Sequence, residues 1–268
     1  MEAAETAILL TEVAARQKQY AHLWRHIREA NGQANPELMR FALKMATGAG
    51  KTTVMAMLIA WQTINAVRTP GSNLFSRGFL IVTPGITIKD RLSVLLPSEP
   101  DNYYTTRKLV PPDLLPEIGK AKIVLTNYHA FKKRVVNEAG KVGRSLMKGW
   151  RGEEIEVEET EGAVLQRACG ELLSLKNVVV INDEAHHCYR ERPKDSAIKG
   201  EDEPVAAEDR EEVKRNAEAA RLWISGVEAL KRKVGVRAVY DLSAAPFSCG
   251  GPAMWRARCF RGRSATSP

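Results

Sequence analysis

The feature that most constrains this chain is a short glycine-containing loop between an apolar run and a helix-forming segment. The loop reads "ATGAGKTT" (residues 46–53), the run before it reads "LMRFALKMA", and the residues from Val54 to Val67 follow with helical composition. Gly48 and Gly50 allow backbone N–H groups to turn inward, and the N-terminus of a following helix favours a negative charge. A strand, a glycine loop and a helix in this order predict a phosphate site.

The polar side chains at the end of the loop indicate which phosphate it holds. Lys51 can reach the β- and γ-oxygens of a nucleoside triphosphate, and the Thr52 hydroxyl can bind Mg²⁺. The full pattern begins with a glycine where this chain has Met45. The alternative is a simple glycine turn at a helix start. We predict ATP and Mg²⁺ as cofactors, bound by Thr47, Gly48, Ala49, Gly50, Lys51, Thr52 and Thr53.

Four further apolar runs end in turn or polar residues. They are "GFLIVTPG" (78–85), "AKIVLTNYHAF" (121–131), "NVVVINDEAHHCY" (177–189) and "VRAVYDLSAAPF" (236–247). Continuous β-branched runs that alternate with helical stretches are typical of a parallel sheet buried on both faces. In such sheets, ligands bind at the carboxyl ends of the strands. The predicted fold is an α/β P-loop domain with helices on both faces.

The third run supplies the acids that a phosphate loop needs. Asp183 follows a buried run, so it is predicted to hold Mg²⁺ at the end of its strand. Glu184 can orient and deprotonate the attacking water. We therefore predict Glu184, Asp183 and Lys51 as catalytic residues, with Thr52 and Asp183 as metal ligands. A zinc site at His186, His187 and Cys188 is a rival interpretation, although it lacks a second ligand pair at useful spacing.

Composition restricts the class of protein. The 268 residues are 44% hydrophobic and 27% charged, and no apolar run approaches the roughly 20 residues of a membrane span. Acids precede the first apolar stretch, so residues 2–30 are predicted to form an amphipathic helix rather than a signal peptide. Four cysteines without paired spacing favour reduced thiols in the cytoplasm.

The distribution of charge along the chain weakens the case that the whole domain binds nucleic acid. The net charge is +8, but four arginines lie in the last 21 residues, and without them it falls to +4. A mildly basic body is compatible with DNA binding without demanding it.

The predicted organisation has three parts. Residues 1–35 form a helical segment, 36–247 form the ATP-binding domain, and 248–268 form a disordered basic tail. Charge-rich insertions are expected at about 138–165 and 190–232, as solvated segments.

Several motifs together resemble those of a known family. Asp183-Glu184-Ala185-His186 is similar to the DEAH box of superfamily 2 helicases and translocases, and "MATGAGKT" resembles their first motif. "IVTPGITIKDRL" and "IVLTNYHAF" resemble two DNA-contacting motifs. "VVINDEAHHCYRE" followed by "DLSAAPF" resembles the Res subunit of type III restriction enzymes. These matches extend from about residue 2 to residue 247.

The resemblance implies a function and further site residues. It implies the N-terminal RecA-like domain of a restriction endonuclease motor, a Mg-ATP-dependent DNA translocase whose hydrolase activity is stimulated by DNA. Double-stranded DNA and a modification methyltransferase subunit are the implied partners. Relatives use strand-end residues equivalent to Thr83, Pro84, Thr126 and Asn127 to contact the DNA backbone, and His186 and Ser243 to couple nucleotide state to DNA.

The chain also departs from the family pattern. Its third motif reads Ser243-Ala244-Ala245 where relatives have Ser-Ala-Thr, and nothing after Phe247 resembles a second RecA-like domain with an arginine finger. The expectation is one lobe of a two-lobed motor with weak turnover. A shifted reading frame of residues 247–263 can give "FLRGSGYVEGTLFPWT", similar to the family's continuation, so the tail is predicted to be a frameshift product. The alternatives are an inactive nucleotide- or partner-binding remnant and, less favoured, a small P-loop kinase.

Overall fold

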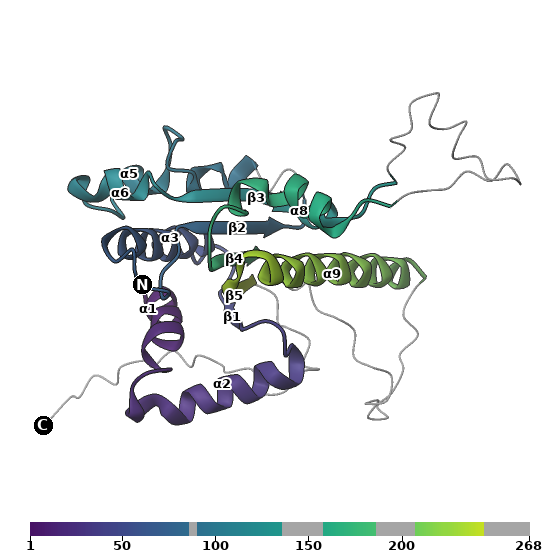
Figure 1. The fold of residues 1–268 in the computed structure, drawn as a ribbon, viewed down its shortest axis with the longest axis horizontal. Coiled ribbons are helices and arrows are strands. Elements are labelled where there is room, and N and C mark those ends of the chain that lie inside the picture. The colour runs from purple at the N-terminus through teal and green to yellow at the C-terminus, as the bar shows by residue number, and fades with distance from the viewer. Residues whose placement is uncertain (86–89, 136–157, 186–206, 244–268) are drawn as a thin grey trace, which may run out of the picture.

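The computed structural model describes residues 1–85, 90–135, 158–185 and 207–243 (Figure 1). The strands are β1 (Arg40–Lys44), β2 (Gly78–Thr83), β3 (Lys122–Asn127), β4 (Val178–Asp183) and β5 (Val236–Ser243). The longer helices are α1 (Glu2–Ile8), α2 (Ala21–Ala34), α3 (Lys51–Arg68), α8 (Glu161–Cys169) and α9 (Ala207–Val234). Short helical turns are η1 (Leu9–Val13), η2 (Lys18–Tyr20), η3 (Ser93–Leu95), α5 (Tyr103–Thr106), η4 (Pro112–Leu114), α6 (Leu115–Ile118), η5 (Tyr128–Phe131) and η6 (Gly170–Leu172).

The five strands form one sheet in the order β1-β5-β4-β2-β3, and every neighbouring pair is parallel. The register places Lys44 beside Ser243 and Thr83 beside Asn127. All strands therefore end at one edge, which gathers the residues that follow them. The prediction of a parallel sheet is confirmed, and each predicted run contains a strand.

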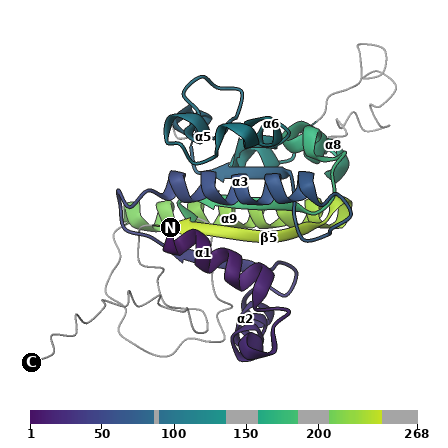
Figure 2. The same cartoon turned by 90° about the vertical axis from the view of Figure 1, so that its left-hand side faces the viewer.

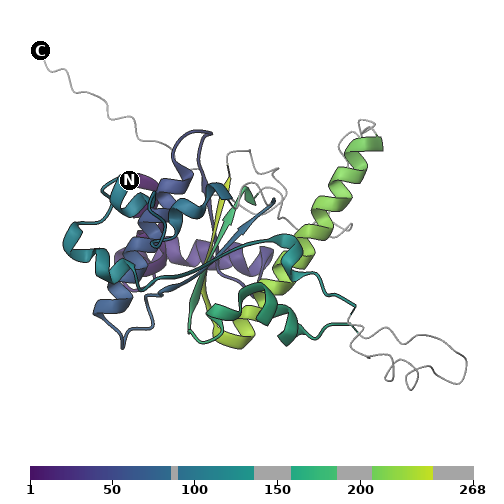
Figure 3. The same cartoon turned by 90° about the horizontal axis from the view of Figure 1, so that it is seen from above.

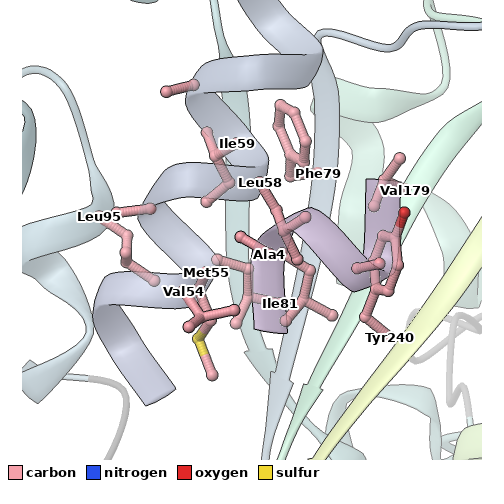
Figure 4. Close-up of a cluster of buried hydrophobic side chains, with 14 of the residues drawn as sticks. Ala4, Val54, Met55, Leu58, Ile59, Phe79, Ile81, Leu95, Val179 and Tyr240 are labelled. Atoms are coloured by element: carbon pink, nitrogen blue, oxygen red, sulfur yellow. The ribbon is translucent and has the colours of Figure 1, made fainter. Parts of the chain in front are cut away.

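Two hydrophobic cores lie on opposite faces of the sheet. Phe79 and Ile81 of β2 pack with α1, α3, α5 and α6, whereas Leu80 and Val82 pack with α8 and α9. Figures 1 and 2 show α3 and α9 on the two sides of the strands. Figure 4 shows the first core, where Met55, Leu58 and Ile59 of α3 meet Phe79 and Ile81. Because both faces are buried, β2 is apolar without alternation.

The N-terminal segment differs from the predicted single helix over residues 2–30. The chain forms α1, then the π-helical turn η1 and the 3₁₀ turn η2, before α2 begins at Ala21. In η1 the side chain of Glu12 is buried and accepts hydrogen bonds from Trp61 and Gln62 of α3. Apolar spacing predicted one continuous helix. The structure instead interrupts the helix at η1, where Glu12 makes these polar contacts with α3.

The interpretation of 190–232 as a solvated insertion is wrong for its C-terminal part. Trp223, Ile224, Val227 and Leu230 of α9 are buried against the sheet, at the three-to-four spacing of a core-facing stripe. Figure 3 shows the first turns of α9 extending beyond the sheet, which is where the charged sequence lies. The high average charge of the segment conceals an apolar stripe in its second half.

Some predictions fall outside the described residues. These concern His186, the rival zinc site, Ala244 and Ala245 of the third motif, most of the first insertion and the C-terminal tail. In the part of the chain that is described, no group of three or more His, Cys, Asp and Glu side chains could hold a metal ion, and no helix is long and apolar enough to cross a membrane. Cys169 is buried as a free thiol.

Candidate nucleotide site at the carboxyl edge of the sheet

The glycine loop closes tightly between β1 and α3. The Met45 amide donates to the Ser243 carbonyl (3.0 Å), which anchors the loop to β5, and the Ala49 amide donates to Ala46 (3.1 Å). Gly48 and Gly50 have φ of 77° and 85°, the left-handed region that side chains with a Cβ disfavour. Space does not require glycine at Gly48, where an added Cβ would meet nothing within 4 Å, so backbone conformation is the reason for it.

The first turn of α3 faces this loop. Gly50 is its N-cap, and its carbonyl accepts the first intrahelical bond, from the Val54 amide (3.0 Å). A helical amide donates to the carbonyl four residues earlier. For the amides of Lys51, Thr52 and Thr53 that carbonyl lies outside α3, so these amides have no partner within the helix. Partial positive charge therefore gathers where the loop ends, as an anion requires.

Lys51 forms an ion pair with Glu184, which directly follows β4. The Lys51 side chain is 15% exposed and that of Glu184 is 28% exposed, so the pair is partly shielded from water. Glu184 has φ of 54°, an unusual conformation for a residue other than glycine. The structure thus brings together two of the predicted catalytic residues from positions 133 residues apart.

Asp183 completes the group. It ends β4 on the α3 face, because Val179 and Ile181 of the same strand pack into the α3 core. Burial raises the pKa of Asp183, the neighbouring Glu184 carboxylate raises it further, and Lys51 opposes both effects. Its Oδ1 atom is buried and accepts no hydrogen bond from the described residues.

A divalent cation fits this unsatisfied oxygen. Mg²⁺ prefers hard oxygen ligands, usually one or two carboxylates together with phosphate oxygens and water. A cation here would also compensate the two adjacent carboxylates. Asp183 thus offers a buried carboxylate oxygen that such a cation would suit, and Thr52, the other predicted metal ligand, lies in the first turn of α3.

The four predicted DNA-contacting residues lie at the ends of neighbouring strands β2 and β3. The Thr83 hydroxyl donates to the carbonyls of Gly85 (3.0 Å) and Thr126 (3.4 Å), and both threonines are buried. The Asn127 side chain caps η5 by accepting from the Ala130 amide (3.1 Å). Of the four, Pro84 and Asn127 are partly exposed, whereas Thr83 and Thr126 are buried as whole residues, main chain included, so Pro84 and Asn127 are the better placed to meet a ligand.

A buried polar network under the site escaped the sequence analysis. Asn182 donates to Asp241 (3.2 Å), and Asp241 accepts from Arg40 (2.8 Å), whose guanidinium lies 5.0 Å from the Trp223 ring centroid. Tyr128 donates to the Asn182 oxygen (3.4 Å), which links the start of η5 to β4. Burial raises the pKa of Asp241, and Arg40 and Asn182 oppose the shift. The sequence signal for this network was the presence of polar residues, Asn182 and Asp241, inside otherwise apolar runs.

The fold and the site together define a class of protein. A parallel sheet in this order, with a glycine loop entering a helix at one strand end and adjacent acids at another, is a RecA-like P-loop domain.

Comparison with known proteins identifies the family within this class. The model of the family "Type III restriction enzyme, res subunit" matches residues 11–221. The chain therefore belongs to the type III restriction enzyme res subunit family, whose domains bind nucleoside triphosphates. No curated protein and no solved structure was found to match it.

Proposed function

We propose that this chain is the ATP-binding motor domain of a restriction endonuclease Res subunit, which couples Mg-ATP hydrolysis to translocation on double-stranded DNA. One observation carries the proposal most directly. Lys51 and Glu184 meet beside the buried, unsatisfied oxygen of Asp183, at the positively polarised start of α3. Anion-binding, cation-binding and proton-accepting groups are thus gathered at one point.

The Lys51–Glu184 ion pair suggests how the site responds to ATP. When the triphosphate enters, Lys51 exchanges Glu184 for the β- and γ-phosphate oxygens. This releases the Glu184 carboxylate from Lys51, so that it can orient water and accept its proton. Thr52 and Asp183 would hold Mg²⁺, which would supply charge stabilisation to the phosphates.

The remaining predicted residues concern the partners. Pro84 and Asn127, which are partly exposed, are proposed to lie against the DNA backbone, which suits movement along DNA of any sequence, whereas the buried Thr83 and Thr126 would hold these strand ends in place. Ser243 supports the glycine loop through its carbonyl, and this contact is a candidate coupling point between β5 and the nucleotide. A methyltransferase subunit is the proposed protein partner.

The proposal is tested by measuring ATP binding and hydrolysis in three variants. Lys51→Ala should abolish Mg-ATP binding by calorimetry while the melting temperature stays close to that of wild type. Glu184→Gln should bind ATP at least as tightly, since it no longer competes for Lys51, but lose about 10²- to 10⁴-fold in DNA-stimulated hydrolysis. Lys120→Ala, an exposed lysine away from the site, is the control.

Two outcomes would overturn parts of this proposal. Equal ATP affinity for Lys51→Ala and wild type would remove the phosphate-site assignment. If wild type and Glu184→Gln bind ATP but are equally inactive with DNA present, the chain is a nucleotide- or partner-binding remnant rather than a motor.

A further inference from the structure

Arg107 lies next to the glycine loop although no motif points to it. It directly follows α5, and its Nη1 atom donates to the hydroxyl of Thr53 in the first turn of α3 (3.3 Å). Its Nη2 atom donates to the Tyr103 hydroxyl (3.2 Å), and the guanidinium carbon lies 4.1 Å from the centroid of the Tyr103 ring. An exposed arginine from a segment 54 residues away is thus brought to the predicted phosphate site.

The segment that carries Arg107 is held firmly. Asn102 caps α5 by accepting from the Thr105 amide (3.1 Å), and its side chain donates to the Glu99 carbonyl (2.7 Å). Tyr104 is fully buried in the α3 core, and its hydroxyl donates to the Leu95 carbonyl (2.8 Å). The stacked guanidinium therefore starts from a fixed base, which lowers the entropy lost when it binds a ligand.

Arg107 and Lys51 approach the helix start from different sides. Side chains two positions apart on an α-helix point in nearly opposite directions, because each residue advances about 100°. Lys51 pairs with Glu184, whereas Thr53 contacts Arg107. The Thr53 hydroxyl is also 3.7 Å from where a Cβ on Gly50 would lie, so this contact is at the junction of loop and helix.

The guanidinium retains capacity for an anion. Arginine has five N–H donors, and the two bonds described use neutral hydroxyl partners. Among the described residues, Arg107 forms no ion pair with a carboxylate. Planar, charged donors of this kind suit phosphate oxygens.

We propose that Arg107 is a further nucleotide-binding residue, which contacts the α-phosphate. This inference rests on the proposed function, in which Lys51, Asp183 and Glu184 mark the γ-phosphate end of the site. A triphosphate that extends from that end along the loop places its α-phosphate on the opposite flank, near Thr53. Because ATP and ADP share the α-phosphate, Arg107 contributes equally to both affinities.

The test compares affinities for Mg-ATP and Mg-ADP by calorimetry. Arg107→Gln should weaken both by about tenfold, the effect of losing about 1.4 kcal/mol from one charge-assisted hydrogen bond. Arg107→Lys keeps the charge and should recover part of the loss. Arg68→Gln removes an exposed arginine at the far end of α3 and should bind like wild type.

Each other result overturns a defined claim. If Arg107→Gln binds normally while Lys51→Ala does not bind, the Arg107 contact is wrong and the proposed function stands. If neither variant changes binding, the proposed function falls as well. A loss for ATP alone would place Arg107 at the γ-phosphate. If Tyr103→Phe loses as much affinity as Arg107→Gln and Arg107→Lys recovers none, the position of α5 matters rather than the guanidinium.

Discussion

Glu12 is an acidic side chain that η1 carries into the protein interior. It is 8% exposed and accepts hydrogen bonds from Trp61 (3.0 Å) and Gln62 (2.6 Å). Burial raises its pKa, although these bonds and the nearby Arg237 oppose the shift. A carboxyl whose pKa is higher in the folded than in the unfolded protein stabilises the fold below its unfolded pKa. That contribution is lost as the pH rises through the folded pKa.

Glu12→Gln should therefore gain stability relative to wild type as the pH rises from about 4 to about 7, the range in which glutamate ionises. At the low end it should be the less stable, by about 1 kcal/mol, because its amide cannot accept every bond that Glu12 accepts. Urea unfolding across this range measures the difference. Glu5→Gln, on the exposed side of α1, is the matched control. Parallel pH profiles for wild type and Glu12→Gln would contradict the burial argument.

At the same scale, the sequence indicated some site residues and not others. Lys51 and Asp183 could be proposed from sequence because local spacing carries their chemistry, and in the structure Lys51 lies close enough to Asp183 to lower its pKa. The Arg40–Asp241 pair was not, since it joins residues 201 positions apart through the register of β1 with β5. Arg107 was missed for a similar reason, because only packing of α5 on α3 brings it to Thr53.

At the scale of elements, Gly226 shows how closely α9 packs on η5. A Cβ added at this helical glycine would lie 2.3 Å from the Phe131 ring. Phe131 is only 4% exposed, so its ring cannot simply move aside. The gain in helix propensity from Gly to Ala, about 1 kcal/mol, is therefore outweighed by overpacking, which typically costs about 1–3 kcal/mol.

We expect Gly226→Ala to lower the free energy of unfolding by about 1 kcal/mol, the middle of the overpacking cost less the gain in helix propensity, measured by urea denaturation. Gly32→Ala is the matched control, because Gly32 is an exposed glycine of α2 and its added Cβ would meet nothing within 4 Å. That variant should be neutral or stabilised. A stabilised Gly226→Ala would show that α9 can shift away from η5 without cost.

The elements that the sequence predicted well are those whose signal is uniform. β2 and β4 are buried along their whole length, so a continuous apolar run identified them. The N-terminal segment and α9 were harder to predict. In the N-terminal segment, apolar spacing continues through η1, where the helix is interrupted and Glu12 contacts α3. In α9, the charged residues of its first half concealed the apolar stripe around Trp223.

At the scale of the whole molecule, the candidate site joins strands that are not neighbours. The glycine loop follows β1 and the two acids lie at the end of β4, with β5 lying between these strands in the sheet. A ligand held by both groups would tie these strands together and bind only the folded chain.

Mg-ATP at 100 times its dissociation constant should then stabilise the fold by about 2.7 kcal/mol. For a domain of this size that corresponds to a rise in melting temperature of roughly 5–10 °C, in a single transition. The rise should shrink when EDTA removes Mg²⁺, because no cation then compensates the negative charges of Asp183 and the triphosphate. The rise should vanish in Lys51→Ala. A rise of the same size in Lys51→Ala would mean that the nucleotide binds elsewhere on the molecule, and the bridging of β1 and β4 would be wrong.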